Sequence, residues 1–283
     1  MDKHLKAAAE FIENTGILAR TDIIPSLNAE MASADVSFDE ILTALSDNKV
    51  LAKKVLAVAN SAWFASRVKI ESVEYAFARL GINEFYSVVL TATLRHGFGE
   101  GPPANLTWAH AEMTARVCQL LAQHFSEALV ELAFATGLLH DCAVPLMVKS
   151  LTNFENLVKP SLGCGLSVNQ LEEERFEFNH AQVGAVLVEA WQFPVMCARA
   201  IEFHHRGSLA EAPEGEARRL LALLILAERV AAVCSCEIMT PFDSKHDTVL
   251  VGEIAEVLDA DLVRIYHVID EAVRMYSIRL AHL

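Results

Sequence analysis

The chain has 283 residues, of which 53% are hydrophobic, and its formal net charge is −14 at pH 7. This length corresponds to about two domains of ordinary size, with enough apolar residues for a substantial core. The negative charge would repel a phosphate backbone, whose recognition depends on Lys and Arg, so we expect no direct nucleic-acid partner.

Apolar segments and cysteines indicate the compartment. The longest uninterrupted apolar run, Leu220–Ala227, is far shorter than the roughly 20 residues that cross a bilayer. The first five residues, from Met1 to Leu5, lack the basic flank and apolar segment of a secretory signal. The six cysteines form no Cys-x-x-Cys pair, and Cys234 and Cys236 would point to opposite sides of a helix. We therefore expect a cytoplasmic protein with reduced thiols and no membrane partner.

Helical periodicity runs along nearly the whole chain, and alternating β-branched runs are almost absent, which predicts an all-α fold. In the first hundred residues, Ser37 and Glu40 have the spacing of a capping box and predict a helix start. Gly81 is expected to end a later helix, and Asn83 to open the next one, which runs through Leu94.

Glycines and prolines cluster between Gly97 and Pro103, where they would interrupt helices and mark a domain boundary. We therefore expect two parts, an N-terminal helical bundle over residues 1–100 and a C-terminal helical domain over residues 105–283. Trp63 and Phe64 would line the crevice between them or pack in the core. In the second part, helices are predicted at 107–124, 128–149, 168–177, 180–191, 194–205, 216–236 and 250–281.

Histidines beside acidic or other histidine residues are the most informative feature of the C-terminal part. Neighbouring residues of a helix differ by about 100° in direction, so an adjacent pair can flank a two-metal site but cannot address one atom unless the helix end is distorted. Imidazole with carboxylate favours Mn, Fe, Zn or Ni over Ca. A single histidine is more often a packed or surface residue, so the prediction of a metal site depends on the group as a whole. Its members are His110, His140, Asp141, His180, His204 and His205.

Several motifs occur in an order known from one family. Residues 135–141, Ala-Thr-Gly-Leu-Leu-His-Asp, resemble the His-Asp helix of the HD superfamily. The other motifs are Ile24-Pro25-Ser26-Leu27, Val55–Ala62, Ala76–Gly81, Asn179–Gly184, Trp191–Pro194 and His204-His205. Over about residues 15–240 the combination resembles the HDOD proteins, bacterial signalling relatives of the HD phosphohydrolases, and implies a C-terminal domain of the HD type.

The resemblance also implies a set of metal ligands and a cofactor of one or two divalent transition-metal ions (Fe, Mn, Ni or Zn). Asp141 would be the bridging carboxylate, and Glu228 stands where the related HD-GYP phosphodiesterases usually carry an aspartate. The matching ligand positions are His110, His140, Asp141, His180, His204, His205 and Glu228.

Departures from the enzymes of that superfamily point away from efficient catalysis. Where the HD-GYP enzymes have Ile-Gly-Lys after the His-Asp pair, this chain has Cys142-Ala143-Val144 and no cation. We therefore expect a regulatory protein that acts through signalling proteins as partners, with weak or no catalysis and a nucleotide as a candidate ligand. The alternative is a metal-dependent phosphohydrolase of a nucleotide or cyclic dinucleotide. Asp141 would then position the nucleophile, and Arg206 would bind phosphate instead of interacting with a helix end in solvent.

Overall fold

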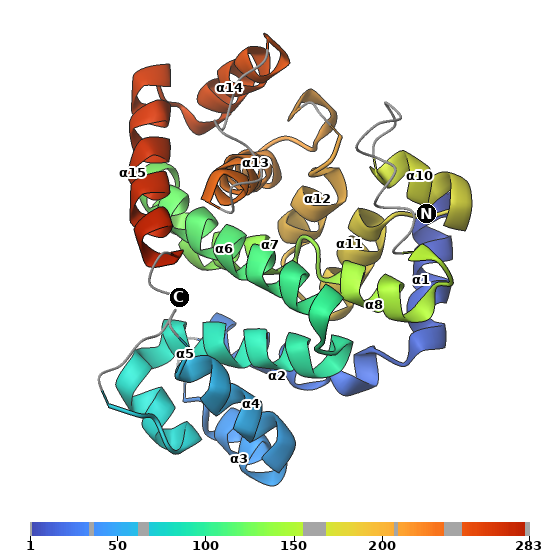
Figure 1. Ribbon diagram of the computed structural model, residues 1–283, viewed down its shortest axis with the longest axis vertical. Coiled ribbons are helices and arrows are strands. Elements are labelled where there is room, and N and C mark those ends of the chain that lie inside the picture. The colour runs from blue at the N-terminus through green and yellow to red at the C-terminus, as the bar shows by residue number, and fades with distance from the viewer. Residues whose placement is uncertain are drawn as a thin grey trace.

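The computed structural model describes residues 2–33, 37–61, 68–154, 168–206, 209–234 and 245–280. Every regular element in those ranges is helical (Figure 1), which confirms the all-α prediction. Trp63, Phe64, Cys164 and Cys236 lie outside the described residues. The α-helices are α1 Lys3–Thr15, α2 Ile23–Ala32, α3 Asp39–Asp47, α4 Lys49–Ala59, α5 Val73–Phe98, α6 Pro102–Phe125, α7 Val130–Leu139, α8 Ala143–Ser150, α10 Val168–Phe176, α11 His180–Ala190, α12 Val195–Phe203, α13 Glu216–Cys234, α14 Lys245–Leu258 and α15 Leu262–Leu280.

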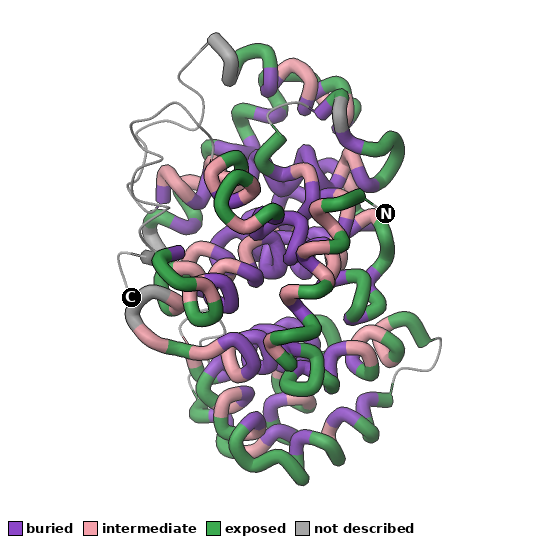
Figure 2. Tube along the Cα trace, turned by 90° about the vertical axis from the view of Figure 1, so that its right-hand side faces the viewer, coloured by how far each residue is buried: buried purple, intermediate pink, exposed green. Residues whose placement is uncertain are grey.

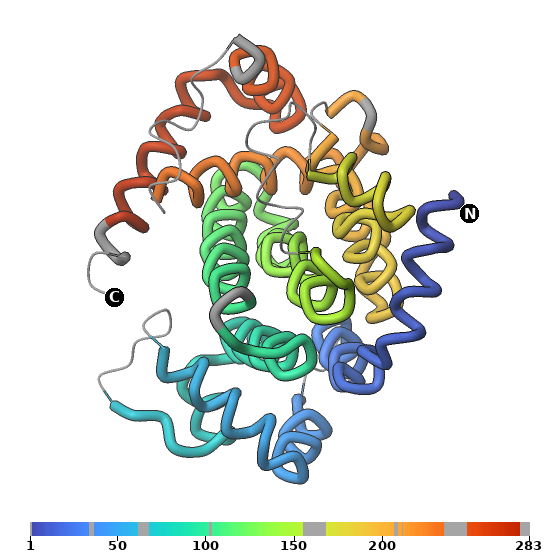
Figure 3. Tube along the Cα trace, turned by 45° about the vertical axis from the view of Figure 1, so that its right-hand side comes forward, coloured from blue at the N-terminus to red at the C-terminus, as the bar shows by residue number. Residues whose placement is uncertain are grey.

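Helix α13 is the central element of the C-terminal part. It contacts α6, α7 and α12 on one side and α14 and α15 on the other (Figure 1). Every residue of its apolar run Leu220–Ala227 is buried, because neighbouring helices surround this part of α13. Buried residues are concentrated in the same central region (Figure 2). Helices α2 to α5 form a separate group at one end, and α1 lies along α11 (Figure 3).

Two helix boundaries of the N-terminal part differ in detail from the sequence prediction. The predicted capping box is not formed, because the hydroxyl oxygen of Ser37 accepts from the backbone N–H of Asp39 and the N–H of Ser37 donates to Glu30. Helix α3 nevertheless begins at Asp39, directly after the fully buried Phe38. The predicted break at Gly81 is present as a kink inside α5, where φ is 76°.

The predicted helix 128–149 is divided at the His-Asp pair, which corrects the sequence prediction. Helix α7 ends at Leu139 and α8 begins at Ala143. Pro145 explains the break, because proline has no backbone N–H and its ring clashes with the carbonyl of the residue four positions earlier, here Asp141. His140 and Asp141 therefore lie in a turn between two helices.

The predicted helix 250–281 is also divided, into α14 and α15. Asp259 has a φ of 54°, a left-handed conformation that an aspartate tolerates better than most residues. Two residues later the carboxylate of Asp261 accepts from the backbone N–H of Arg264 and caps the start of α15. The last predicted helix is therefore two helices with a capped turn between them.

Within the described residues, one stretch is long and apolar enough to cross a membrane, Glu127–Ser150. Its most apolar window is 72% buried inside the protein, and the turn after α7 interrupts it. Core packing accounts for its composition.

A close helix contact brings α6 against α7. A Cβ atom added to Gly137 would lie 2.7 Å from the Cα of Ala115, so only glycine fits there. The contact also places His110, near the middle of α6, beside the end of α7, where His140 lies.

Helix α11 ends in a set of hydrogen bonds that we call the Trp191 seam, formed by the buried Thr21, Tyr86 and Trp191 and the partly buried Asn28. The indole N–H of Trp191 donates to the hydroxyl of Thr21 at 2.9 Å, and the amide of Asn28 donates to the backbone carbonyl of Trp191 at 2.9 Å. The hydroxyl of Tyr86 donates to the side-chain oxygen of Asn28 at 2.9 Å. The seam thus joins α2 and α5 to α11.

Candidate metal centre

Seven side chains of metal-ligating type converge in two adjacent groups. Within each group, one potential ligand atom from each residue lies within 4.8 Å of the others. These are all seven residues that the sequence identified as candidate ligands. One group is Asp141, His180, His204 and His205, and the other is His110, His140 and Glu228.

Five parts of the fold supply these side chains. His180 is the first residue of α11, and the His204-His205 pair directly follows α12. The remaining contributions are His110 from α6, His140 and Asp141 from the turn after α7, and Glu228 from α13. Because the helix ends at Leu139, the adjacent His140 and Asp141 can both face the centre, which a continuous helix would not allow.

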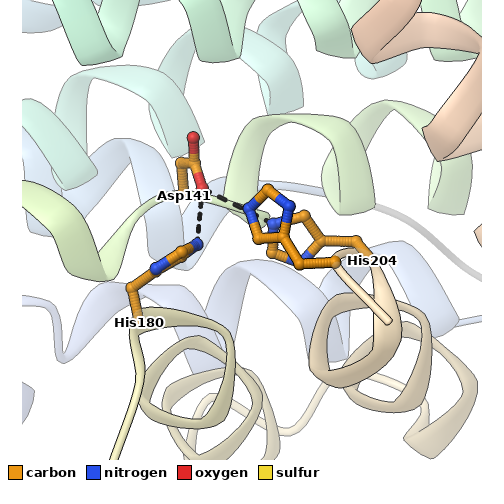
Figure 4. A group of neighbouring side chains, drawn as sticks. Asp141, His180 and His204 are labelled. Atoms are coloured by element: carbon orange, nitrogen blue, oxygen red, sulfur yellow. Dashed lines mark ion pairs between the residues drawn. The ribbon is translucent and has the colours of Figure 1, made fainter. Parts of the chain in front are cut away.

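Asp141 lies between the two groups. Its Oδ1 atom is 3.4 Å from His180 Nε2 and 3.6 Å from His204 Nε2 (Figure 4), and its Oδ2 atom is 3.3 Å from His140 Nε2. The same Nε2 atom of His140 lies 3.8 Å from Glu228 Oε1. Atoms that ligate one ion at about 2.0–2.2 Å are themselves separated by about 3–4 Å, so these spacings suit shared ions, with Asp141 as the bridge.

Four of these atoms are buried and have no hydrogen-bond partner: Nε2 of His140, His180 and His204, and Oδ1 of Asp141. Leaving one buried polar atom unpaired costs about 1–3 kcal/mol, so four in one place are unusual unless something else satisfies them. A divalent cation is one species that neutral imidazoles and a carboxylate satisfy together. The residues present therefore fit a metal ion.

Hydrogen bonds at the opposite ring nitrogens orient two of these histidines. His140 Nδ1 lies 2.7 Å from the carbonyl oxygen of Gly137, and His204 Nδ1 lies 2.6 Å from that of Ile201. A nitrogen facing a carbonyl carries the proton of the neutral ring, so Nε2 has the lone pair that can bind a cation once any proton on it is lost. Both rings are thus held with the ligating atom directed into the centre.

The carboxylates and His140 each favour the charged form of the other. Burial alone lowers the pKa of His140, but the carboxylates of Asp141 and Glu228 outweigh burial and raise this pKa to about 9. Burial raises the pKa of Asp141, yet the surrounding histidines, His140 foremost, hold it well below its usual range. The centre therefore attracts positive charge, and a metal ion would compete there with protons.

One side of the centre is open to solvent. His205 is exposed, and His110, Asp141 and Glu228 are partly exposed. Arg206 is exposed as well, and its guanidinium carbon lies 5.2 Å from the ring centre of Phe203 at the end of α12. Among the described residues, these side chains form the exposed edge of the centre, whereas the four ligand atoms named above are buried beneath it.

Comparison with protein families matches residues 18–207 of the chain to the HDOD domain. A protein of Treponema pallidum described as uncharacterized is 26% identical over 248 residues, which cover 80% of this chain and 45% of that protein. This chain therefore spans less than half the length of that relative.

Two solved structures share the fold. A protein from Shewanella amazonensis, provisionally named a phosphohydrolase, gives a TM-score of 0.67 at 21% identity and covers 93% of this chain and 95% of its own. A protein from Marinobacter aquaeolei, provisionally named a signal transduction protein, gives a TM-score of 0.70 at 18% identity, with coverages of 93% and 58%. At these identities the likeness concerns the fold alone.

Proposed function

We propose that this chain, which belongs to the HDOD domain family, is a signalling protein. It would bind one or two divalent transition-metal ions around Asp141. The observation that carries the proposal is the set of four buried ligand atoms without hydrogen-bond partners. His110, His140 and Glu228 would hold one ion, and His180, His204 and His205 the other, with Asp141 between them. Mn, Fe, Ni and Zn are the candidate metals.

We further propose that the protein acts through protein partners and not through efficient catalysis. Next to the His-Asp pair, Cys142 and Ala143 are fully buried apolar positions and add no phosphate-binding charge. The guanidinium of Arg206 rests over Phe203. The signalling name of the Marinobacter aquaeolei protein agrees with such a role. A cytoplasmic location and a nucleotide ligand stay predictions from the sequence.

The direct test is the metal content of protein purified without a histidine tag and without chelators. Plasma mass spectrometry should find about one or two transition-metal ions per chain. The His140→Ala/Asp141→Ala double variant should contain essentially none, because it removes one ligand of the His110, His140 and Glu228 group and the carboxylate between the two groups. Circular dichroism of the double variant checks that its helices are intact. Wild-type protein that stays free of metal, even after incubation with each candidate ion, would rule out the proposal.

A phosphohydrolase is the second candidate. It is favoured by the position of Asp141, which is partly exposed and contacts histidines of both groups. Bound divalent ions would polarise a phosphoryl group. Asp141, which contacts both groups, would orient the attacking water, and Arg206 would have to leave Phe203 to reach a phosphate. Metal-loaded protein should then hydrolyse a nucleotide or cyclic dinucleotide, and an Asp141→Asn variant should not. Equal rates for the two proteins would exclude this centre as the source of activity.

A further inference from the structure

His180 differs from the other two buried histidines in what holds its ring. His140 and His204 direct Nδ1 to a carbonyl three residues earlier in the chain. His180 is the first residue of α11, so no preceding turn of its own helix can supply such a carbonyl. Its Nδ1 instead lies 2.7 Å from Oε2 of Glu172, a residue of the separate helix α10.

Glu172 is built into this contact. Its side chain is 1% exposed, and the same Oε2 atom accepts the backbone N–H of His180 at 2.8 Å. The neighbouring carboxylate of Glu173 accepts from the side chains of Asn179 and Gln182, so α10 is fastened to the start of α11 at two adjacent points. A buried carboxylate is costly unless it is paired, and here the pairing partner is a candidate ligand.

We propose that Glu172 is a positioning residue that sets the metal affinity of the Asp141, His180 and His204 group. The carboxylate fixes the proton of His180 on Nδ1, which directs the Nε2 lone pair toward Asp141, 3.4 Å away. A carboxylate behind an imidazole also makes the imidazole a stronger ligand than a backbone carbonyl does. The inference rests on the proposed metal centre. It means that a carboxylate orients His180, whereas backbone carbonyls orient His140 and His204.

The test is a titration of tag-free, metal-free protein with Mn²⁺, in which electron paramagnetic resonance measures the free ion. Glu172→Gln keeps the shape of the side chain but removes its charge, and its amide can donate to Nδ1 and reverse the tautomer. One ion should bind about 10–100-fold more weakly, and the other with wild-type affinity. Glu172→Asp, which keeps the charge on a shorter side chain, should fall between Glu172→Gln and wild type.

Glu173→Gln is the matched control, since Glu173 lies next in the chain and contacts the same end of α11 through Asn179 and Gln182 instead of His180. It should leave both Mn²⁺ affinities within about threefold of wild type, well inside the range expected for loss of an orienting partner. Equal loss in both variants, or loss of both ions in Glu172→Gln, would show a merely structural role for α10. Wild-type affinity in Glu172→Gln would overturn the inference and leave the metal centre standing, whereas wild-type protein that binds no ion would contradict the centre itself.

Discussion

The two ends of helix α11 contain buried or partly buried polar groups of opposite character. At its end, in the Trp191 seam, the indole of Trp191, the amide of Asn28 and the hydroxyl of Tyr86 all have hydrogen-bond partners within the protein. At its start, the Nε2 atom of His180 and the facing Oδ1 atom of Asp141 have none. Polar groups that the chain satisfies by itself indicate structure, whereas polar groups left unsatisfied in a cluster indicate a ligand.

The largest expected effect is a rise in the free energy of unfolding when a metal ion binds at the start of α11. An ion that binds only the folded state raises the free energy of unfolding by about 2.7 kcal/mol at one hundred times its Kd and about 4.1 kcal/mol at one thousand times. Urea denaturation with and without the metal measures this increment. The His140→Ala/Asp141→Ala variant should show no increment. If metal stabilised that variant as much as wild type, the ion would bind elsewhere. The unsatisfied polar atoms at the start of α11 would then not indicate a ligand.

A smaller effect should follow from the contact between α6 and α7. In Gly137→Ala, the new Cβ would lie 2.7 Å from the Cα and 2.9 Å from the N of Ala115, so the helices must separate. Overpacking of this kind costs about 1–3 kcal/mol, and the separation should release the ion held by His110 and His140. Denaturation and metal content measure the two consequences.

Gly252→Ala is the control for that substitution. Gly252 lies inside α14, and a Cβ added there would meet no atom within 4 Å. Alanine should therefore stabilise the protein by about 0.5–1 kcal/mol and leave its metal content unchanged. A Gly137→Ala variant as stable as Gly252→Ala would contradict the role assigned to the close contact.

The sequence named side chains that the fold brings together, but not the reason that they meet. Adjacent His140 and Asp141 could share a centre only at a distorted helix end, and Pro145, four residues after Asp141, is the local signal that such an end exists. Glu172 had no comparable signal, because it is one of three consecutive glutamates, and its burial and its contact with His180 arise from tertiary packing. The helix class follows from local periodicity, whereas the partner of a buried carboxylate depends on tertiary contacts.

The same limit applies to helix boundaries. Ser37 and Glu40 have the spacing of a capping box, yet Ser37 donates its N–H to Glu30, which the spacing alone cannot reveal. Asp259 and Asp261, by contrast, carry a readable signal for the break between α14 and α15, since aspartate tolerates a positive φ and caps helices. A helix boundary can be predicted from the sequence when the capping hydrogen bond joins residues a few positions apart. It cannot be predicted when the hydrogen-bond partner belongs to another helix.

The smallest expected effect on metal binding tests whether the two ends of α11 are independent. Trp191→Phe removes the indole donor to Thr21, whose hydroxyl still donates to the carbonyl of Ile17, and places a smaller ring in a fully buried position, so the loss should be about 1–3 kcal/mol. His180 is the first of the 11 residues of α11 and Trp191 directly follows the last, so they lie about 16 Å apart along the helix. At that distance the Mn²⁺ affinities of Trp191→Phe should equal those of wild type, while urea denaturation detects its lower stability. A weakened affinity would instead mean that α11 and the helices packed on it transmit changes from the seam to the centre.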